Sequence, residues 1–419
     1  MSKKLILFVA ALMFIFLGNA YSAVENIKVS GDLTTYAGSR YGFDLGAGGD
    51  EADASFLATI ARLKFDADLT EDVSATLRLI TDKVWGQTVS NATSDVDIDL
   101  AYVTLKNFFN YPLTLKIGKQ EIKIGSGVIV GDPTTNQLAS GDSNLPATLG
   151  DLDLRKAFDA VVAVVDYSPW TITLGYIKDT EGDDLAANDD VNVYAVDLGY
   201  NFEDYNTQAE LYYVLKDAKK SDVGNIGVRV VGSPRENLTV SGEVIYQYDK
   251  PDARSDKKHR SDLAALVAAS YTFADQAWKP TVGVDYAYFS ENWDPMYEDI
   301  TPANIVNNIL PNTDVQLIGL TVTAQPQEDV LLKLRYANLR LVEEISSLSN
   351  AWLPSTLTTY SINSDKKDLG DEVDFSIVYN YTEDVQLGLN LDYFNPGKVF
   401  NGVNDDDAFQ ALGSLKVTF

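Results

Sequence analysis

Eight times along this chain, two stretches of alternating apolar and polar residues flank a turn of two to five residues. Three copies with acidic turns are Phe65–Leu79, Thr323–Leu339 and Asn380–Phe394, and looser copies are Asn110–Gln120, Tyr167–Tyr176, Phe202–Leu215, Gly232–Tyr246 and Phe273–Phe289. A period of two places successive side chains on opposite faces of a β-strand. One apolar face combined with turns that are short on one side predicts a transmembrane β-barrel.

Longer polar segments alternate with these eight short turns. They span residues 36–54, 86–94, 125–154, 180–189, 217–222, 250–259, 292–311, 344–370 and 396–406. Nine long loops and eight short turns predict eighteen antiparallel strands, with both chain ends on the short-turn side. In bacterial outer-membrane barrels the short turns are periplasmic and the long loops extracellular. We therefore expect an all-β transmembrane barrel in the outer membrane of a Gram-negative-type bacterium.

Both ends of the chain support export to that membrane. Residues 1–22 form an expected signal peptide, with Lys3 and Lys4 before an apolar run and a small-residue cleavage site after it. Residues 23–419 are then the barrel. Its last strand alternates up to the terminal Phe419. Bacterial outer-membrane barrels end similarly, and this resemblance implies that the barrel-assembly machinery recognises Phe419 as an assembly signal.

Composition narrows the partners. The chain has no cysteine and a net charge of −28, so a nucleic-acid partner is not expected because phosphate would be repelled. The acids gather in Asp179–Asp190, Asp365–Glu372 and Asp405–Asp407. Calcium would be attracted to such loops and to lipopolysaccharide beside them, although no stretch has the spacing of a dedicated metal site. We expect no other cofactor, and contact with outer-membrane lipid and lipopolysaccharide.

The polar half of the alternation predicts the lining of the pore. A charge on the lipid face costs roughly 2–4 kcal/mol near mid-bilayer, so charged faces are expected to point inward. The basic and amide residues assigned inward in this way are Arg62, Lys64, Arg78, Lys116, Gln120, Arg229, Lys333 and Arg335. The acidic residues assigned inward include Asp197, Glu210, Glu243, Asp285, Asp374 and Asp392.

Two interpretations of this lining stay open, and both can hold in one barrel. The charges can form cross-strand pairs that stiffen the wall. The expected pairs are Glu210 with Arg229, Arg229 with Glu243, and Arg335 with Asp374. The basic residues can also form a cationic ladder that guides anionic solutes through a lumen wide enough for them. The ladder would consist of Arg62, Lys64, Arg78 and Lys116.

Some segments fit the alternation less well. The fourth and sixth strands, AYVTLKNFF and FDAVVAVVDY, contain apolar runs, so their facing is ambiguous and a bulge could switch it. Among the long loops, Gly125–Leu154 is the best candidate for folding inward and narrowing the pore. Asn292–Pro311 is expected to carry a short helix after Pro302. For any one loop, an external flap is the alternative.

Two segments resemble the alginate-export family of outer-membrane porins. Asp99–Gly127 carries Gly118-Lys119-Gln120, and Leu154–Tyr176 carries Arg155 followed by Phe158-Asp159. The resemblance implies a monomeric eighteen-stranded barrel and a passive conduit for an anionic polysaccharide or a small anionic solute. It also places Arg155 and Asp159 in the pore lining. Lysine stands where that family commonly has arginine, which weakens a bidentate grip on carboxylates.

These features favour a channel over other classes of membrane protein. The single histidine, His259, lies in a polar loop, and no specific pair of carboxylates suggests glycoside hydrolysis, so we expect no enzyme. The first strand directly follows the leader, which leaves no room for a receptor plug domain. We expect a porin for small hydrophilic, mildly anion-biased solutes. The alternatives are a dedicated exporter of an anionic polysaccharide and a structural or adhesive surface barrel.

Overall fold

The computed structural model describes most of the chain outside its first 25 residues. The described residues are 26–47, 53–86, 96–134, 145, 147–181, 190–218, 221–251, 260–345, 348–349, 359–360, 362–400, 402 and 404–419. The expected signal peptide and His259 therefore lie outside the described residues.

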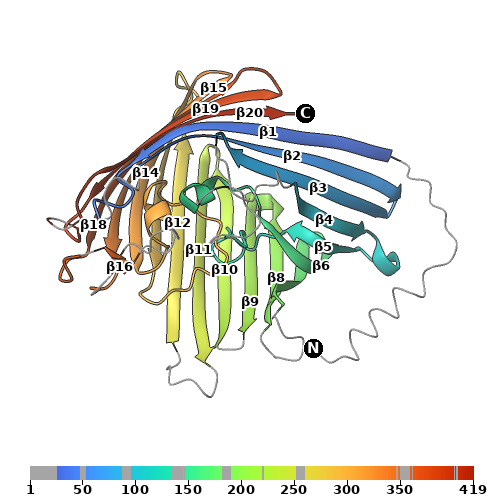
Figure 1. Ribbon diagram of the computed structural model, residues 1–419. Coiled ribbons are helices and arrows are strands. Elements are labelled where there is room, and N and C mark those ends of the chain that lie inside the picture. Colours follow the sequence, from blue (N-terminus) through green and yellow to red (C-terminus); the bar gives the residue numbers. More distant parts are fainter. Residues whose placement is uncertain are drawn as a thin grey trace.

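Eighteen antiparallel strands close into one barrel, which confirms the expected fold and strand number (Figure 1). The strands are β1 (Asn26–Tyr41), β2 (Ala54–Thr70), β3 (Val73–Val84), β4 (Asp97–Leu105), β5 (Leu113–Glu121), β6 (Ala157–Tyr167), β7 (Trp170–Thr180), β8 (Val191–Phe202), β9 (Thr207–Ala218), β10 (Ser221–Arg235), β11 (Leu238–Pro251), β12 (Arg260–Thr272), β13 (Thr281–Phe289), β14 (Val315–Gln327), β15 (Val330–Leu341), β18 (Asp368–Asn380), β19 (Val385–Pro396) and β20 (Ala408–Thr418). A separate two-stranded hairpin, β16 (Leu348–Ser349) with β17 (Thr359–Tyr360), lies in one long loop.

The first and last strands close the barrel. β1 pairs with β20 from Asp32 opposite Thr418 to Tyr41 opposite Phe409. Beyond that ladder, Gly31 and Phe419 exchange two backbone hydrogen bonds of 2.9 and 3.0 Å. A Cβ atom on Gly31 would lie 2.7 Å from the Phe419 ring, so glycine leaves room for the terminal aromatic ring beside the seam. The closure pairs both edges of the eighteen-stranded sheet, as a membrane requires.

Alternation of burial along each strand separates the two faces of the wall. Side chains such as Leu57, Val228 and Leu320 are 42–49% exposed on the outside, whereas their sequence neighbours on the other face are partly or fully buried. Aromatic side chains gather near the short turns. They include Phe109, Tyr111, Tyr167, Trp170, Tyr205, Trp278 and Tyr381. Such rings suit the interface between lipid and water. Within the described residues, no helix has the length and apolar character needed to cross a membrane.

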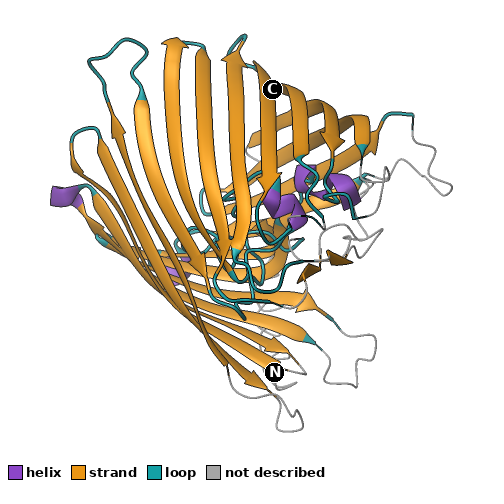
Figure 2. Ribbon diagram, turned by 90° about the vertical axis from the view of Figure 1, so that its left-hand side faces the viewer, coloured by secondary structure: helices purple, strands orange, loops and turns teal. Residues whose placement is uncertain are grey.

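Long loops fold back into the lumen and pack there (Figure 2). We call residues 122–134 and 290–314 the two inward segments. The first contributes Val128, Ile129 and Val130, each at most 1% exposed, to a hydrophobic cluster that includes inner-wall residues such as Phe158. The second carries the short helix α2 (Val306–Ile309), so the helix expected after Pro302 is present but shorter. The described residues also form three 3-10 turns: η2 (Phe108–Asn110), η3 (Ala147–Leu152) and η4 (Glu203–Tyr205).

The fourth and sixth strands, whose facing was ambiguous from the sequence, depart from the simple alternation for different reasons. In β4 the register against β3 shifts between Arg78 and Leu79, and this bulge turns Asp99 inward onto Arg78. In β6 the inward residues Phe158, Ala160 and Val162 are apolar because they pack against the lumen core rather than against water. The strand is therefore apolar on both faces along most of its length, as a strand buried on both sides should be.

Candidate transport pathway

A group of basic side chains lies on the inner face of β2, β3 and β5, as the alternation predicts. We call Arg62, Lys64, Arg78 and Lys116 the basic wall. Lys64 and Arg78 are direct cross-strand neighbours, so their side chains share one face of the sheet. Their like charges would repel each other unless other groups intervene.

Carboxylates on the same face intervene at three of the four residues. Arg62 donates to both oxygens of Asp32, at 2.7 to 3.1 Å. Lys64 pairs with Asp66 at 2.9 Å, and Arg78 bridges Asp99 and Glu121. The ammonium of Lys116 instead lies 5.1 Å from the centre of the Tyr102 ring, a cation–π contact. The basic wall is therefore largely compensated in charge.

Two further predicted residues lie at the inner wall but are buried. Gln120 is 2% exposed, and its amide donates to the backbone oxygens of Lys116, Gly118 and Ala160 at 3.1 to 3.2 Å. Arg155 is 7% exposed and pairs with three aspartates. Its partners are Asp82, Asp97 and Asp153, at 2.8 to 3.0 Å. Burial alone would lower the pKa of Arg155, but the three carboxylates raise it above its usual value. Gln120 therefore links the backbones of β5 and β6, and Arg155 links the segment before β6 to β3 and β4.

Asp159 does not line the pore, so its predicted position is wrong. It is exposed on β6 between the buried, inward Phe158 and Ala160, on the same outward face as Val161. Its register partners are Lys119 on β5 and Lys178 on β7. The motif that suggested a pore position puts Arg155 on one side of the wall and Asp159 on the other.

The remaining predicted cations lie further round the barrel. Arg229 pairs with Glu210 at 3.2 Å, as expected, whereas its other register neighbour Glu243 binds elsewhere. Arg335 lies opposite Asp374 in register but donates to Asp285, at 2.6 and 2.8 Å. Its Nε also donates to the backbone oxygen of Pro302 in an inward segment, at 3.1 Å. Within the described part of the chain, Lys333 is an exposed inward cation that forms no ion pair.

A second group of charged residues holds the inward segments against the wall. We call Glu243, Asp262, Glu372 and Asp392 the carboxylate anchors; each is at most 9% exposed. The two oxygens of Glu372 accept the backbone N–H groups of Ile305 and Val306, at 2.8 and 2.9 Å.

The other three anchors contact the inward segments in the same way. Glu243 accepts the backbone N–H of Ser126 at 3.2 Å and also its hydroxyl. Asp262 accepts the Ser290 hydroxyl at 2.8 Å and the Asn292 N–H at 3.3 Å. Asp392 accepts from Asn304, at 3.2 Å. Sequence alternation places Glu243 and Asp392 inside but carries no signal for these loop contacts.

The two inward segments are also joined to each other. Tyr297 and Ile129 are linked by a 2.9 Å backbone hydrogen bond, and Asp299 donates its N–H to Gly127 at 2.7 Å. The Asp299 carboxylate pairs with Lys123 at 3.1 Å and with Lys156. Burial alone would raise the pKa of Asp299, but these two lysines hold it below its usual value. Of the segment expected to narrow the pore, Gly125–Leu154, the described residues 125–134 fold inward together with the second inward segment.

The pKa of the neighbouring Glu298 is shifted in the opposite direction from that of Asp299. It is 3% exposed and accepts a hydrogen bond from Asn312 at 3.0 Å. Burial raises the pKa of Glu298 to about 8, against the opposing effect of Asn312. The carboxyl is therefore mostly protonated at neutral pH.

The calcium prediction stays a prediction. Among the described residues, no group of three or more His, Cys, Asp or Glu is arranged to hold a metal ion. Most of the acidic stretch 179–190 lies outside the described residues. In the acidic segment Asp405–Asp407, Asp407 accepts hydrogen bonds from Tyr393 and Asn395 at 2.6 and 2.8 Å.

Comparisons with known proteins agree with this geometry. A family model described as Alginate export matches residues 32–304. No curated protein matches the chain. Solved structures from Pseudomonas aeruginosa share the fold. The outer-membrane protein OprD has a TM-score of 0.61 at 10% identity, covering 96% of each chain. OpdQ has a TM-score of 0.60 at 14% identity, covering 94% of this chain and 99% of its own. OpdK, solved with vanillate, has a TM-score of 0.59 at 12% identity, covering 94% and 100%.

Proposed function

Because the chain belongs to the alginate export family, whose model matches residues 32–304, we propose that it is a passive outer-membrane channel for small hydrophilic solutes. The observation that carries this proposal is the closed barrel with an apolar outside and a charged inside. A barrel of eighteen strands leaves a lumen that water and solutes can enter. Such a wall belongs in the outer membrane of a Gram-negative bacterium.

The lining supports weak ion selectivity. Three of the four residues of the basic wall are bridged to carboxylates, so the field that a passing ion meets is mixed in sign. Lys116 and Lys333 retain the basic charge without an ion pair to a described residue. We propose a mild preference for anions near these two lysines. The proposed conduit performs no catalytic step.

Passage of a long polysaccharide is the less favoured alternative. The two inward segments meet inside the barrel and are tied to the wall by the carboxylate anchors, so they narrow the path. A polymer would need both segments displaced along its whole transit. Small solutes can pass beside them, because the basic wall itself remains partly exposed, as at Lys64.

Planar-bilayer recording and liposome swelling test the proposal together. The purified barrel should give ohmic conductance with a small reversal potential in a salt gradient, and liposomes should swell faster with small sugars than with oligosaccharides. An acidic polysaccharide that blocks the conductance would support the exporter instead. Absence of any conductance would refute the channel and support a structural or adhesive barrel.

Assembly and partners complete the proposal. We propose that the barrel works as a monomer and that the assembly machinery reads its last strand, because Phe419 remains 64% exposed beside the seam. Phe419→Ala should lower the amount of heat-modifiable barrel in outer membranes, and Phe419→Tyr should restore it. Equal amounts of all three would contradict this role.

A further inference from the structure

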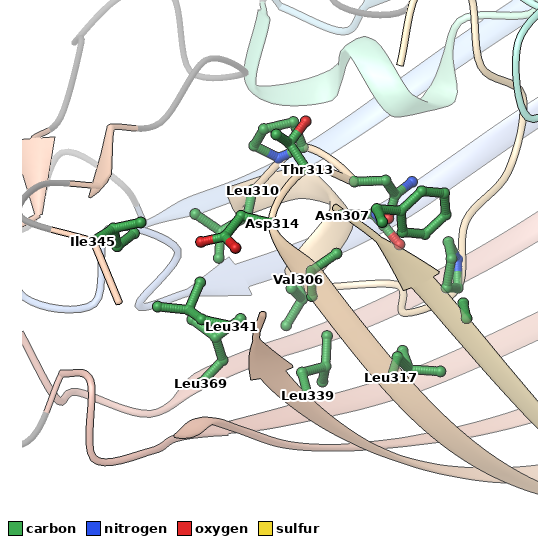
Figure 3. A pocket seen from close by; sticks show the side chains of 16 residues that line it. Val306, Asn307, Leu310, Thr313, Asp314, Leu317, Leu339, Leu341, Ile345 and Leu369 are labelled. Carbon is green, nitrogen blue, oxygen red and sulfur yellow. The ribbon is translucent and has the colours of Figure 1, made fainter. Parts of the chain in front are cut away.

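One cavity lies between an inward segment and the barrel wall, apart from the basic wall. It is bounded on one side by α2 and the chain that follows it, and on the other by the inner faces of β13, β14 and β15 (Figure 3). Its volume is about 190 Å³. A dry apolar cavity of about 150 Å³ is large enough to bind benzene. The space therefore suits one small ring.

The lining is mostly apolar. The side chains of Val306 and Leu310 face those of Leu317, Leu339 and Leu341 across the cavity, and each of the five is at most 6% exposed. Leu341, Leu339 and Leu317 project inward from the wall, while α2 supplies the opposite side. Water gains few hydrogen bonds in such a space, so an apolar molecule can replace it at little cost.

One oxygen in this lining is buried and has no partner. Asp314 is 6% exposed, and its Oδ2 atom forms no hydrogen bond although it is buried. Its other oxygen, Oδ1, accepts the backbone N–H of Glu343 at 2.8 Å, which fixes the side chain. Figure 3 shows the carboxylate of Asp314 among Leu310, Leu341 and Ile345. A buried acceptor without a donor is costly, so a ligand that brings a donor would gain from it.

The other polar groups at the cavity are already satisfied. Asn307 accepts the N–H of Ala303 at 2.9 Å and donates to Asn312 at 2.8 Å. Asn312 in turn donates to Glu298. Among the described side chains that line the cavity, Asp314 therefore has the buried oxygen that can accept a hydrogen bond from a ligand.

We propose that this cavity is a binding site for a small, neutral aromatic or cyclic molecule that carries one hydroxyl or amine donor. The ring would fill the space between α2 and the wall, and the donor would bind Asp314 Oδ2. Such a ligand joins α2 to β13–β15 and so stabilises the inward position of the second inward segment. The site is separate from the charged path proposed for hydrophilic solutes.

Crystals soaked with 4-bromophenol or 4-bromotoluene test the geometry directly. The bromine of the phenol should give an anomalous peak between Val306, Leu317 and Leu339, with its oxygen near Asp314 Oδ2. The toluene, which fits but has no donor, should give a weaker peak or none. Equal peaks, or a phenol peak elsewhere only, would overturn the proposal.

Affinity in detergent-free nanodiscs gives the second test, with binding to empty nanodiscs subtracted. By fluorine NMR, 4-fluorophenol should bind at least tenfold more tightly than 4-fluorotoluene. Asp314→Asn keeps an oxygen for the Glu343 N–H but presents a donor to the cavity. It should abolish this preference and favour the acceptor-only 4-fluoroacetophenone.

If Asp314→Asn does not fold, Val306→Phe is a second test variant, because its larger side chain on α2 fills the cavity. It should abolish phenol binding while heat-modifiable migration is kept. A phenol affinity unchanged in a folded Asp314→Asn or Val306→Phe protein would refute the site.

Discussion

On β2, β3 and β5 the charged side chains face the lumen and bridge to partners on neighbouring strands, whereas on β11, β12, β18 and β19 the charged side chains hold loops. Arg62 and Lys64 of the basic wall remain 17% and 33% exposed in their side chains. Glu372 and Asp392 among the carboxylate anchors are fully buried. The first region meets solutes, and the second decides how much of the lumen is left open to them.

The difference has an energetic consequence. Ion pairs that water can reach contribute only about 0–1 kcal/mol each, so the basic wall adds little to stability. A buried carboxylate that accepts two backbone N–H groups is different, because its loss leaves both donors without a partner. We therefore expect variants of the anchors to change the shape of the pore and variants of the basic wall to change its selectivity.

Replacing Glu372 with alanine should have the largest effect. The N–H groups of Ile305 and Val306 would lose their acceptors, at roughly 1–3 kcal/mol each. A loss of about 2.8 kcal/mol would raise the displaced fraction of the second inward segment about a hundredfold. Single-channel conductance should rise, with frequent transitions between two levels.

Two variants test whether the effect depends on the anchor contact. Glu372→Gln keeps one acceptor oxygen and should give an intermediate conductance. Glu383→Gln, in an exposed short turn, removes the same charge without touching a loop and should leave conductance unchanged. Wild-type conductance in Glu372→Ala would show that the segment stays inward without its anchor.

The inward segments should also respond to pH through Glu298, with the next largest effect. Its pKa is raised to about 8 by burial, against the ordinary value of 4.5. Between pH 4.5 and pH 8, Glu298 keeps its proton when the second inward segment is in place and releases it when the segment is displaced. The inward position therefore becomes less stable as pH rises. The loss would be on the order of a few kcal/mol across this window. It is complete by about pH 8.

Hydrogen exchange of the backbone amides in residues 290–314 measures this response. Protection, corrected for the intrinsic pH dependence of exchange, should be higher at pH 5 than at pH 8. Glu298→Gln stays neutral and keeps the contact with Asn312, so its protection should be nearly independent of pH. The same pH dependence in that variant would assign the effect to another group.

The barrel could be predicted from the sequence because its cause is local. Alternation, turn length and charge placement are properties of neighbouring residues, and they fixed the strand number and the inward face of Arg62, Lys64 and Arg78. The prediction for Asp159 failed because it rested on a resemblance in sequence motif, and a motif does not say which face of the strand a side chain is on unless the alternation is considered with it. A bulge was one possibility for the fourth and sixth strands; it occurs in β4 at Asp99, whereas the pairing of β6 with β5 and β7 shows no register shift.

The contacts inside the lumen could not be predicted in the same way. Glu372 binds residues that lie 66 and 67 positions away in the chain, and Glu243 binds Ser126 at a separation of 117. Such pairs depend on how a loop folds back, which has no period in the sequence. Arg335 shows the same limit, because it turns from its register neighbour Asp374 to Asp285 and Pro302.

Neutralising the basic wall should change selectivity more than pore size. The triple variant Arg62→Gln, Lys64→Gln and Arg78→Gln leaves Asp32, Asp66 and Asp99 without their cations. A unit charge at 4 Å contributes about 1 kcal/mol in water, so the ratio of cation to anion permeability should rise about threefold or more. Reversal potentials in a KCl gradient measure this shift. Lys119→Gln on the outward face is the matched control, and an unchanged potential in the triple variant would refute the cationic ladder.

The smallest expected effect is the shift in reversal potential caused by removing a single lysine, and it tests whether solutes follow the basic wall or another part of the lumen. Lys116→Gln and Lys333→Gln each remove one inward cation that has no ion pair to a described residue. If the solute path follows the basic wall, Lys116→Gln should shift the reversal potential and Lys333→Gln should shift it less. Both shifts should nearly vanish at 1 M KCl, where the Debye length falls to about 3 Å. A larger shift in Lys333→Gln would place the path along β15 instead, and a shift that survives high salt would indicate a change of structure rather than of field.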